Sequence, residues 1–194
     1  MKRALSALLL LCVCAGVHAQ NPGGLAPVSA FDKIADKDKR AVALFQEAGR
    51  VIMSPRCLNC HPADDHPRQG EAMKVHEPPV ERGAGGMGAS GMRCITCHGA
   101  ANFERVPGNP RWFLAPKEMA WIGRSLGEIC QQIKDPKRNG GKKLDEIVHH
   151  MAEDELVAYG WNPGPVRTPA PGTQKEFGAL IKAWADNGAA CPKP

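Results

Sequence analysis

Aromatic side chains are scarce in this sequence, and residues that favour loops are common. Phe, Trp and Tyr together make up 5% of the 194 residues, whereas Gly contributes 21 residues and Pro 17. A chain with few large side chains and many loop-forming residues builds only a thin hydrophobic core. We therefore expect something other than side chains to fill the middle of the fold.

The chain also lacks the charge pattern of a nucleic-acid-binding protein. Its formal net charge is +5, and no regular basic stripe runs along it. The composition therefore predicts no nucleic-acid partner.

Only one long apolar run occurs, over residues 4–17, and it follows Lys2 and Arg3. A basic start, a short apolar stretch and a small residue at Ala19 are typical of a cleaved secretory signal. The alternative, an anchoring helix, is disfavoured because the run is short for a membrane span. We expect residues 1–19 to be a signal peptide, a periplasmic mature protein that begins at Gln20, and membrane contact only through a partner.

Six cysteines follow this segment, and an oxidising compartment favours their covalent use. They are Cys57, Cys60, Cys94, Cys97, Cys130 and Cys191. The first four form two similar motifs, which leaves Cys130 and Cys191. We predict a disulfide between these two, with a pair of buried free thiols as the alternative. The bridge would join the C-terminal helix to the helix expected at residues 117–134.

The two motifs have the form C-x-x-C-H, the attachment pattern of a c-type haem. Their members are Cys57, Cys60 and His61 in the first motif, and Cys94, Cys97 and His98 in the second. Two thiols three positions apart can form thioethers with both vinyl groups of one porphyrin, and the adjacent histidine can then bind the iron. The sequence therefore predicts two covalent haem c groups, with His61 and His98 as proximal iron ligands.

Two other readings of a C-x-x-C pair are weaker here. A zinc ribbon is disfavoured because 33 residues separate Cys60 from Cys94, more than its usual gap. A thioredoxin-like site is disfavoured because no β-α-β pattern surrounds either pair. Neither alternative explains why a histidine follows both pairs.

The sixth ligand of each iron is predicted to be a second histidine, His76 for one haem and His150 for the other. His76 lies between the motifs, from where it could reach either iron. His150 shares the side of its predicted helix with Ile147, whereas the neighbouring His149 points about 100° away. A methionine ligand, Met87 or Met92 in the glycine-rich stretch, is the alternative and would raise the reduction potential.

Apolar periodicity predicts a mainly α protein. Helices are expected at residues 32–53, 117–134, 142–154 and 174–187. Residues 20–30 should be a flexible N-terminus, residues 62–92 a loop wrapped over haem, and residues 160–173 an extended proline-rich connector. Too few residues separate the motifs for two tandem modules. We therefore expect one integrated, loop-rich di-haem cytochrome c domain over residues 31–194, with helices packed around both haems.

Beyond the motifs, several stretches resemble a known family. They are residues 92–98, 134–141, 160–164 and 184–192. Together they resemble small exported cytochromes described as subunits of isoquinoline 1-oxidoreductase, a class of molybdenum hydroxylases. The resemblance implies a cytochrome that accepts electrons from such an aldehyde- or N-heterocycle-oxidising enzyme. The chain has no molybdopterin-binding features and is too short to be the catalytic subunit.

The sequence therefore predicts an electron-transfer protein, or an electron-transfer subunit of an oxidoreductase, that has no catalytic residues of its own and passes electrons towards the respiratory chain. The alternative is a small peroxidase-like haem enzyme with one open iron position. Residues 134–143 carry five basic residues and one acid. Such a patch could help to dock an acidic redox partner, or could simply be a solvated loop.

Overall fold

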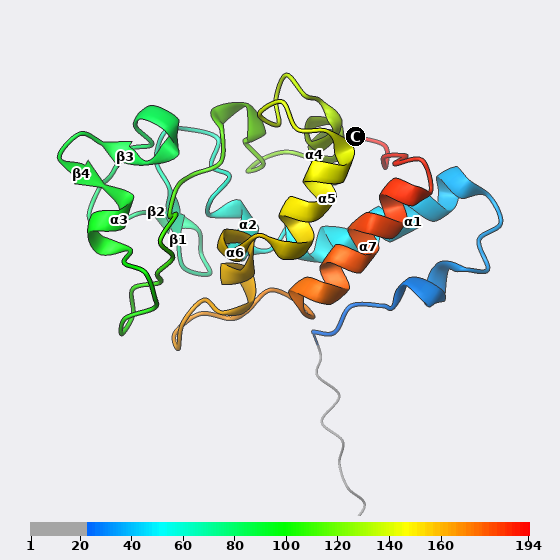
Figure 1. Ribbon diagram of the computed structural model, residues 1–194, viewed down its shortest axis with the longest axis horizontal. Coiled ribbons are helices and arrows are strands. Elements are labelled where there is room, and N and C mark those ends of the chain that lie inside the picture. The colour runs from blue at the N-terminus through cyan, green and yellow to red at the C-terminus, as the bar shows by residue number, and fades with distance from the viewer. Residues whose placement is uncertain (1–22) are drawn as a thin grey trace, which may run out of the picture.

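The computed structural model describes residues 23–194, so the expected signal segment lies outside the described residues. The fold is mainly α and loop-rich, as predicted, with 42% of residues helical and 6% in strands. Figure 1 shows the longer helices gathered at one end of the molecule and the short strands at the other. We refer to the second region, residues 62–115, as the loop lobe.

Three helices form the centre of the helical end. They are α1 (Lys37–Ile52), α5 (Leu144–Glu153) and α7 (Gln174–Asp186). Helix α7 packs against both α1 and α5 (Figure 1). The predicted helices at 32–53, 142–154 and 174–187 are therefore present with slightly shorter bounds. Asp36 begins α1 by accepting a hydrogen bond from the Lys39 amide at 2.9 Å, because the first amides of a helix need an acceptor from outside it.

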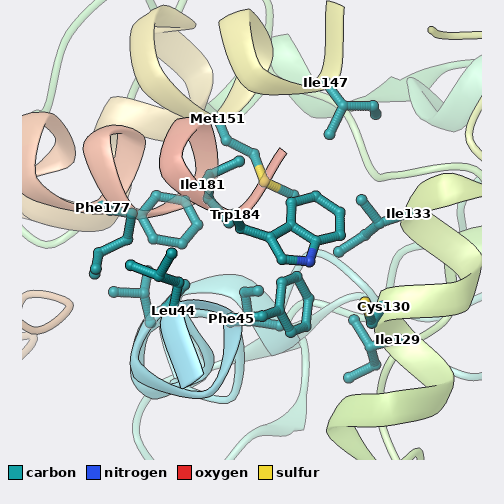
Figure 2. Packing of buried hydrophobic residues seen from close by; sticks show 14 of the residues in the cluster. Leu44, Phe45, Ile129, Cys130, Ile133, Ile147, Met151, Phe177, Ile181 and Trp184 are labelled. Atoms are coloured by element: carbon teal, nitrogen blue, oxygen red, sulfur yellow. The ribbon is translucent and has the colours of Figure 1, made fainter. Parts of the chain in front are cut away.

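The hydrophobic core lies where these helices meet (Figure 2). Trp184 is fully buried, and its ring centroid lies 4.9 Å from that of Phe45 on α1. The indole Nε1 of Trp184 donates to the Ala190 carbonyl at 2.9 Å, so its polar atom is also satisfied. Each fully buried large side chain of this kind contributes about 1.5–3 kcal/mol of transfer free energy. The few aromatic residues are thus concentrated where they bury the most area.

The predicted disulfide is present. Cys130 on α4 (Leu126–Lys134) is bonded to Cys191, which follows α7, with their Cα atoms 5.7 Å apart. Cys130 is fully buried. The bridge ties the C-terminal end of the chain to α4, as the sequence predicted.

The prediction of one helix over residues 117–134 is wrong. A short 3-10 turn at Lys117–Met119 is followed by irregular chain, and α4 begins only at Leu126. The chain departs from helix because the Trp121 amide donates to the His61 carbonyl, at 2.9 Å, and Gly123 has φ +81°. Ser125 then caps α4 by accepting from the Glu128 amide at 3.2 Å.

The remaining elements are short. Single-turn helices lie at α2 (Pro55–Leu58), α3 (Cys94–Cys97) and α6 (Glu155–Ala158), and further 3-10 turns lie at Val28–Phe31, Ala84–Gly86 and Tyr159–Trp161. Most of residues 160–173 is irregular, in keeping with the predicted connector.

The loop lobe contains two small antiparallel hairpins that the sequence did not predict. Strand β1 (Arg68–Gln69) pairs with β2 (Lys74–Val75), and β3 (Gly88–Ala89) pairs with β4 (Met92–Arg93). Each strand has only two residues, which is too short for a visible alternation of apolar and polar side chains. The region expected to be a loop therefore has local pairing.

Main chain packs directly on main chain within this lobe. Gly83 and Gly86 have φ of +61° and +76°, and a Cβ at either position would overlap backbone atoms, those of Gly88 and Leu114 respectively. The Leu114 amide also donates to the Gly86 carbonyl at 2.9 Å. Only glycine can adopt this conformation and permit this approach without strain.

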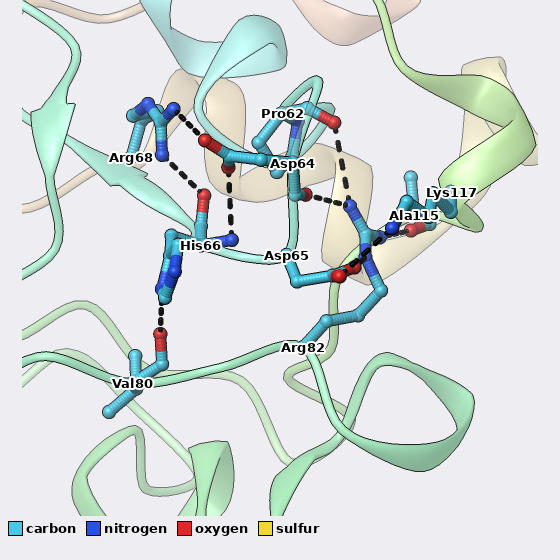
Figure 3. Close-up of polar contacts among 9 residues, drawn as sticks. All are labelled: Pro62, Asp64, Asp65, His66, Arg68, Val80, Arg82, Ala115 and Lys117. Carbon is cyan, nitrogen blue, oxygen red and sulfur yellow. Dashed lines mark hydrogen bonds and ion pairs between the residues drawn. The ribbon is translucent and has the colours of Figure 1, made fainter.

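Arg82 joins segments of the loop lobe that are distant in sequence (Figure 3). This side chain is mostly buried, and its guanidinium donates to the carbonyls of Asp64, at 2.9 Å, and Ala115. It also pairs with the Asp65 carboxylate at 3.3 Å, which in turn pairs with Lys117 at 2.9 Å. Because several acceptors share one cation, Arg82 holds together segments that are distant in sequence.

The segment expected to be flexible, residues 20–30, makes defined contacts in its described part. Leu25 is buried, the Ala26 amide donates to Glu47 at 2.8 Å, and Arg50 donates to the Gly24 carbonyl at 2.7 Å. Both partners lie on α1, so residues 23–30 run along that helix. Within residues 23–194, no helix has the length and apolar character needed to span a membrane.

Candidate functional site

The first C-x-x-C-H motif lies at one wall of an internal cavity. Helix α2 carries Cys57, and two successive tight turns, with hydrogen bonds of 3.1 Å, place Cys60 and His61 immediately after it. All three side chains line a cavity of about 420 Å³. Its other walls come from α1, α5, α6, residues 111–121 and the start of the proline-rich connector. A volume in this range is typical of cofactor pockets in proteins.

His61 is held in one tautomer and orientation. Its Nδ1 lies 2.7 Å from the Met119 carbonyl oxygen, which can only accept, so Nδ1 carries the proton and Nε2 keeps its lone pair. The ring stacks on Trp121, with centroids 3.5 Å apart and planes 7° apart. Burial lowers the pKa of His61 to about 4, so the imidazole is neutral at neutral pH. A neutral, oriented imidazole is the form that binds a metal.

His150 lines the same cavity from α5. Its Nδ1 lies 3.3 Å from the Asp154 carboxylate, which also accepts from Arg111 at 3.0 Å. Burial lowers the pKa of His150, although the Asp154 charge opposes that shift. The neighbouring His149 is 70% exposed and pairs with Glu153 on the surface. His150, which the helix periodicity favoured, therefore lines the cavity, and His149 does not.

The second motif repeats the arrangement of the first. Cys94 and Cys97 bracket the single turn of α3, and His98 follows it. The Nδ1 of His98 lies 2.7 Å from the Pro107 carbonyl oxygen, and the ring stacks on Trp112 with centroids 4.2 Å apart and planes 3° apart. Burial lowers the pKa of His98 as well. Each motif thus presents a histidine whose Nδ1 faces a carbonyl, whose Nε2 has no hydrogen-bond partner among the described residues, and whose ring lies flat on an indole.

His76 lies beside this second histidine. The centroids of the His76 and His98 rings are 5.9 Å apart, and the Nδ1 of His76 lies 3.0 Å from the Pro78 carbonyl oxygen. Two imidazoles that bind one metal from opposite sides have centroids about 6 Å apart, because each metal–nitrogen bond is about 2 Å long. His76 and His98 are therefore spaced as two ligands of a single iron would be.

An aromatic contact joins the two sites. Trp112, which stacks on His98, meets Tyr159 edge to face with centroids 4.9 Å apart. Tyr159 lines the first cavity. Burial, followed by the charge of Cys60, raises the pKa of Tyr159. The second site thus contacts the wall of the first through two side chains.

The methionines proposed as alternative ligands lie beside the second motif, where the Cys94 amide donates to the Met87 carbonyl at 3.0 Å and Met92 is in the strand that precedes Cys94. Met87 and Met92 are 45% and 47% exposed, and the Met87 sulfur accepts a hydrogen bond from Arg93 at 2.9 Å. Two other methionines, Met119 and Met151, line the first cavity. Met119 supplies the carbonyl that holds His61, and Met151 reaches towards Trp184 in the core (Figure 2).

The thiols of the first motif are protonated at neutral pH. Burial raises the pKa of Cys57 to about 12 and the pKa of Cys60 to about 11. Zinc binds thiolates and needs about four ligands in a structural site. Among residues 23–194, no group of three or more His, Cys, Asp or Glu side chains is arranged to hold a metal ion.

Some residues of the site were not identified from the sequence. Trp112, Trp121 and Tyr159 complete the two sites, and Arg56 lines the first cavity. In a chain with few aromatic residues, the presence of Trp112, Trp121 and Tyr159 in the segment that follows the second motif was a usable signal. Arg56 directly precedes Cys57, but a single arginine carries no signal of its own.

Comparison with protein-family models, curated proteins and solved structures found no match. The function must therefore be argued from the two sites themselves.

Proposed function

We propose that this chain is a two-haem c-type cytochrome that transfers electrons. The observation that carries the proposal is the duplicated site. Each C-x-x-C-H motif has its histidine tied through Nδ1 to a carbonyl and stacked on an indole. Each also has a second histidine nearby, His150 on the wall of the first cavity and His76 beside His98. This arrangement fits six-coordinate iron, which suits electron transfer because no position is open to a substrate.

Each haem would be held by two cysteines and two histidines. Cys57 and Cys60 would attach one haem, and His61 and His150 would bind its iron. Cys94 and Cys97 would attach the second haem, and His98 and His76 would bind its iron. When bound, each haem supplies an iron that takes up and releases one electron. The carbonyls bonded to Nδ1 of the proximal histidines fix which nitrogen faces the iron and increase its basicity.

The two sites would operate as a relay. The contact between Trp112 and Tyr159 leaves little protein between them. Trp112 and Tyr159 would then lie between the two haems and shorten the distance that an electron has to cross within the chain.

Export to the periplasm is supported by the disulfide between Cys130 and Cys191. Structural disulfides form and persist in oxidising compartments. The expected signal peptide would bring the chain to the periplasm, where c-type haem would be attached.

The physiological donor is proposed to be a molybdenum hydroxylase that oxidises aldehydes or N-heterocycles, as the resemblance implies. The basic segment at residues 134–143 lies at the rim of the first cavity, because Asn139 and Lys142 line that cavity. Asn139 is buried and donates to the Ile133 and Lys142 carbonyls, which fixes the segment. An acidic partner that docks here would approach the first haem.

The proposal is tested by producing the protein in a host with haem-attachment machinery. We expect the visible spectrum of a c-type cytochrome and an intact mass, after acid and organic extraction, with two added haems. One haem, or none, would contradict the proposal. A colourless protein that contains zinc would instead support the zinc reading.

Carbon monoxide distinguishes electron transfer from the alternative, a haem enzyme with an open iron. Carbon monoxide binds ferrous haem only where a coordination position is free. We expect no carbon monoxide difference spectrum for the reduced protein at neutral pH. Binding at one haem would favour the enzyme.

The docking surface has a separate test. Reversing the charges of Lys137 and Arg138 to glutamate should slow reduction by the partner at low salt, because such patches mainly raise the association rate. The difference should disappear at high salt, where the charges are screened. Charge reversal of Lys182, which pairs with Asp186 on α7, is the control. Equal rates for the docking variant and the wild type at low salt would exclude this surface.

A further inference from the structure

Arg56 is the most deeply buried cation at the first cavity. It lies on α2 immediately before Cys57, and its side chain is 1% exposed. Arginine is almost never fully buried unless it is paired, since its guanidinium carries five N–H donors that all require acceptors. The partners of Arg56 therefore indicate what the site is built to hold.

Only one nitrogen of the guanidinium has a hydrogen-bond partner among the described residues. Nη2 donates to the Glu71 carboxylate at 3.1 Å. Glu71 is half-exposed, and the same oxygen also accepts from the Thr168 amide at 3.0 Å. Nε and Nη1 of Arg56 are buried and have no hydrogen-bond partner among the described residues. Buried donors without acceptors are rare in native proteins, so these donors are expected to meet an acceptor that the described residues do not supply, a water or a ligand.

The missing partner is a hydrogen-bond acceptor at the cavity. Arg56 lines the cavity, and the other cavity-lining residue with an unpartnered buried polar atom, Trp121, also presents an N–H donor. The carboxylate of Asp154, which lines the same cavity, is already engaged by Arg111 and His150. Nε and Nη1 of Arg56 and Nε1 of Trp121 are therefore unpaired donors at this cavity among the described residues.

We propose that Arg56 binds a propionate carboxylate of the haem attached at Cys57 and Cys60. This inference rests on the proposed function. A haem carries two propionates, and the planar fork of arginine matches a carboxylate with two parallel hydrogen bonds. Each edge of that fork contains one N–H of Nη2, paired with Nε on one side and with Nη1 on the other, and Glu71 accepts from Nη2 only. Glu71 thus holds the guanidinium in place while Nε or Nη1 meets the haem.

The reduction potential follows from this arrangement. A positive charge close to the haem favours the reduced iron, because reduction adds one negative charge. Arg56 therefore holds the potential of the first haem above the value that a neutral side chain would allow. It is a positioning residue for the haem rather than an iron ligand.

The test compares the two reduction potentials of the haem-loaded wild type and variants by spectroelectrochemical titration. Replacement of Arg56 by Gln should lower one midpoint potential and leave the other unchanged. Replacement of Glu71 by Gln removes a negative charge while Arg56 stays, so it should not lower that potential. Arg124→Gln is the matched control, since Arg124 is 45% exposed, pairs with Glu128 on the surface and does not line the cavity. It should change neither midpoint.

Two results would overturn the inference. Unchanged potentials in Arg56→Gln would mean that Arg56 does not act on the haem. If the midpoint potential fell by the same amount in Glu71→Gln, the loss of the Arg56–Glu71 ion pair would explain both shifts. A contact between Arg56 and the haem would then not be needed. Intact mass reports the haem number separately, so a chain without two haems refutes the proposed function and not merely the role of Arg56.

A crystal structure of the loaded wild type gives an answer even if Arg56→Gln does not fold. We expect Nε or Nη1 within about 3.2 Å of a propionate oxygen. A guanidinium that contacts only Glu71 and water would refute the inference. Arg56→Lys, which keeps the charge and loses the fork, should retain most of the potential while losing the paired contact.

Discussion

The disulfide between Cys130 and Cys191 should stabilise the fold mainly by restricting the unfolded chain. The bond joins residues separated by 61 positions. In the loop-closure model, a closed loop of that length contributes about 4 kcal/mol at 25 °C. The folded state should change little when the bond is lost, because other contacts hold the same tail. Lys134 donates to the Ala189 carbonyl at 2.7 Å, and Trp184 donates to the Ala190 carbonyl at 2.9 Å.

Replacement of Cys191 by Ala is the cleanest perturbation. Cys130 is fully buried, so its truncation would add a cavity cost, whereas Cys191 is only half-buried. The free energy of unfolding is measured with urea by far-ultraviolet circular dichroism, with and without a thiol reductant, which does not cleave thioethers. We expect Cys191→Ala to lower the stability by about 4 kcal/mol and to steepen the denaturant dependence, because the released unfolded chain exposes more surface.

The reductant provides the internal control. It should destabilise the wild type by a similar amount and leave Cys191→Ala unaffected. A loss below about 1 kcal/mol in the variant would refute the loop-closure argument for this bond. A further loss on adding reductant to the variant would mean that the reagent acts elsewhere.

Three other predictions concern the ligands and the loop lobe. His150→Ala should open one iron and allow carbon monoxide to bind one reduced haem, whereas His149→Ala should behave as the wild type. Identical carbon monoxide spectra for the two variants would show that His150 is not an iron ligand. His76→Ala should open the other iron. The double variant that lacks both His76 and His150 should bind two carbon monoxide molecules per chain. Binding of only one would show that one of these two histidines is not an iron ligand. Arg82→Gln should lower the free energy of unfolding by roughly 3 kcal/mol, because several buried acceptors lose their donor. Lys117→Gln, which removes an exposed ion pair, should cost less than about 1 kcal/mol in the same urea titration, and equal losses would contradict the role given to Arg82.

The helices that could be predicted were those whose apolar stripe is a local property. Helices α1, α5 and α7 show such stripes, and their inward residues form the core. The predicted helix at residues 117–134 failed because its backbone is used by a distant segment. The Trp121 amide bonds to the His61 carbonyl, and no pattern within residues 117–134 reports that partner. Local periodicity cannot show where a long-range hydrogen bond competes with helix.

The residues of the candidate site also fall into those that a local motif identifies and those that only folding brings together. The two C-x-x-C-H motifs are local and could be read directly, and the disulfide followed because two cysteines remained. The carbonyls of Met119 and Pro107 that orient the histidines are brought in by folding, and so are the stacked indoles. His76 comes beside His98 through the loop lobe, where its amide donates to the Pro67 carbonyl at 3.0 Å. Sequence could place His76 between the motifs but could not choose its iron.

The glycines of the loop lobe have a consequence for how this protein tolerates mutation. In the helical end, a deep mutational scan should find its sensitive positions at the large apolar residues of the core, as in most globular proteins. In the loop lobe, Phe103 is 71% exposed and Val75 50%, so such residues should accept many replacements. Gly83 and Gly86 should accept almost none, since any side chain there would collide with neighbouring backbone. Substitutions would thus be tolerated least at large apolar residues in the helical end and least at glycines in the loop lobe.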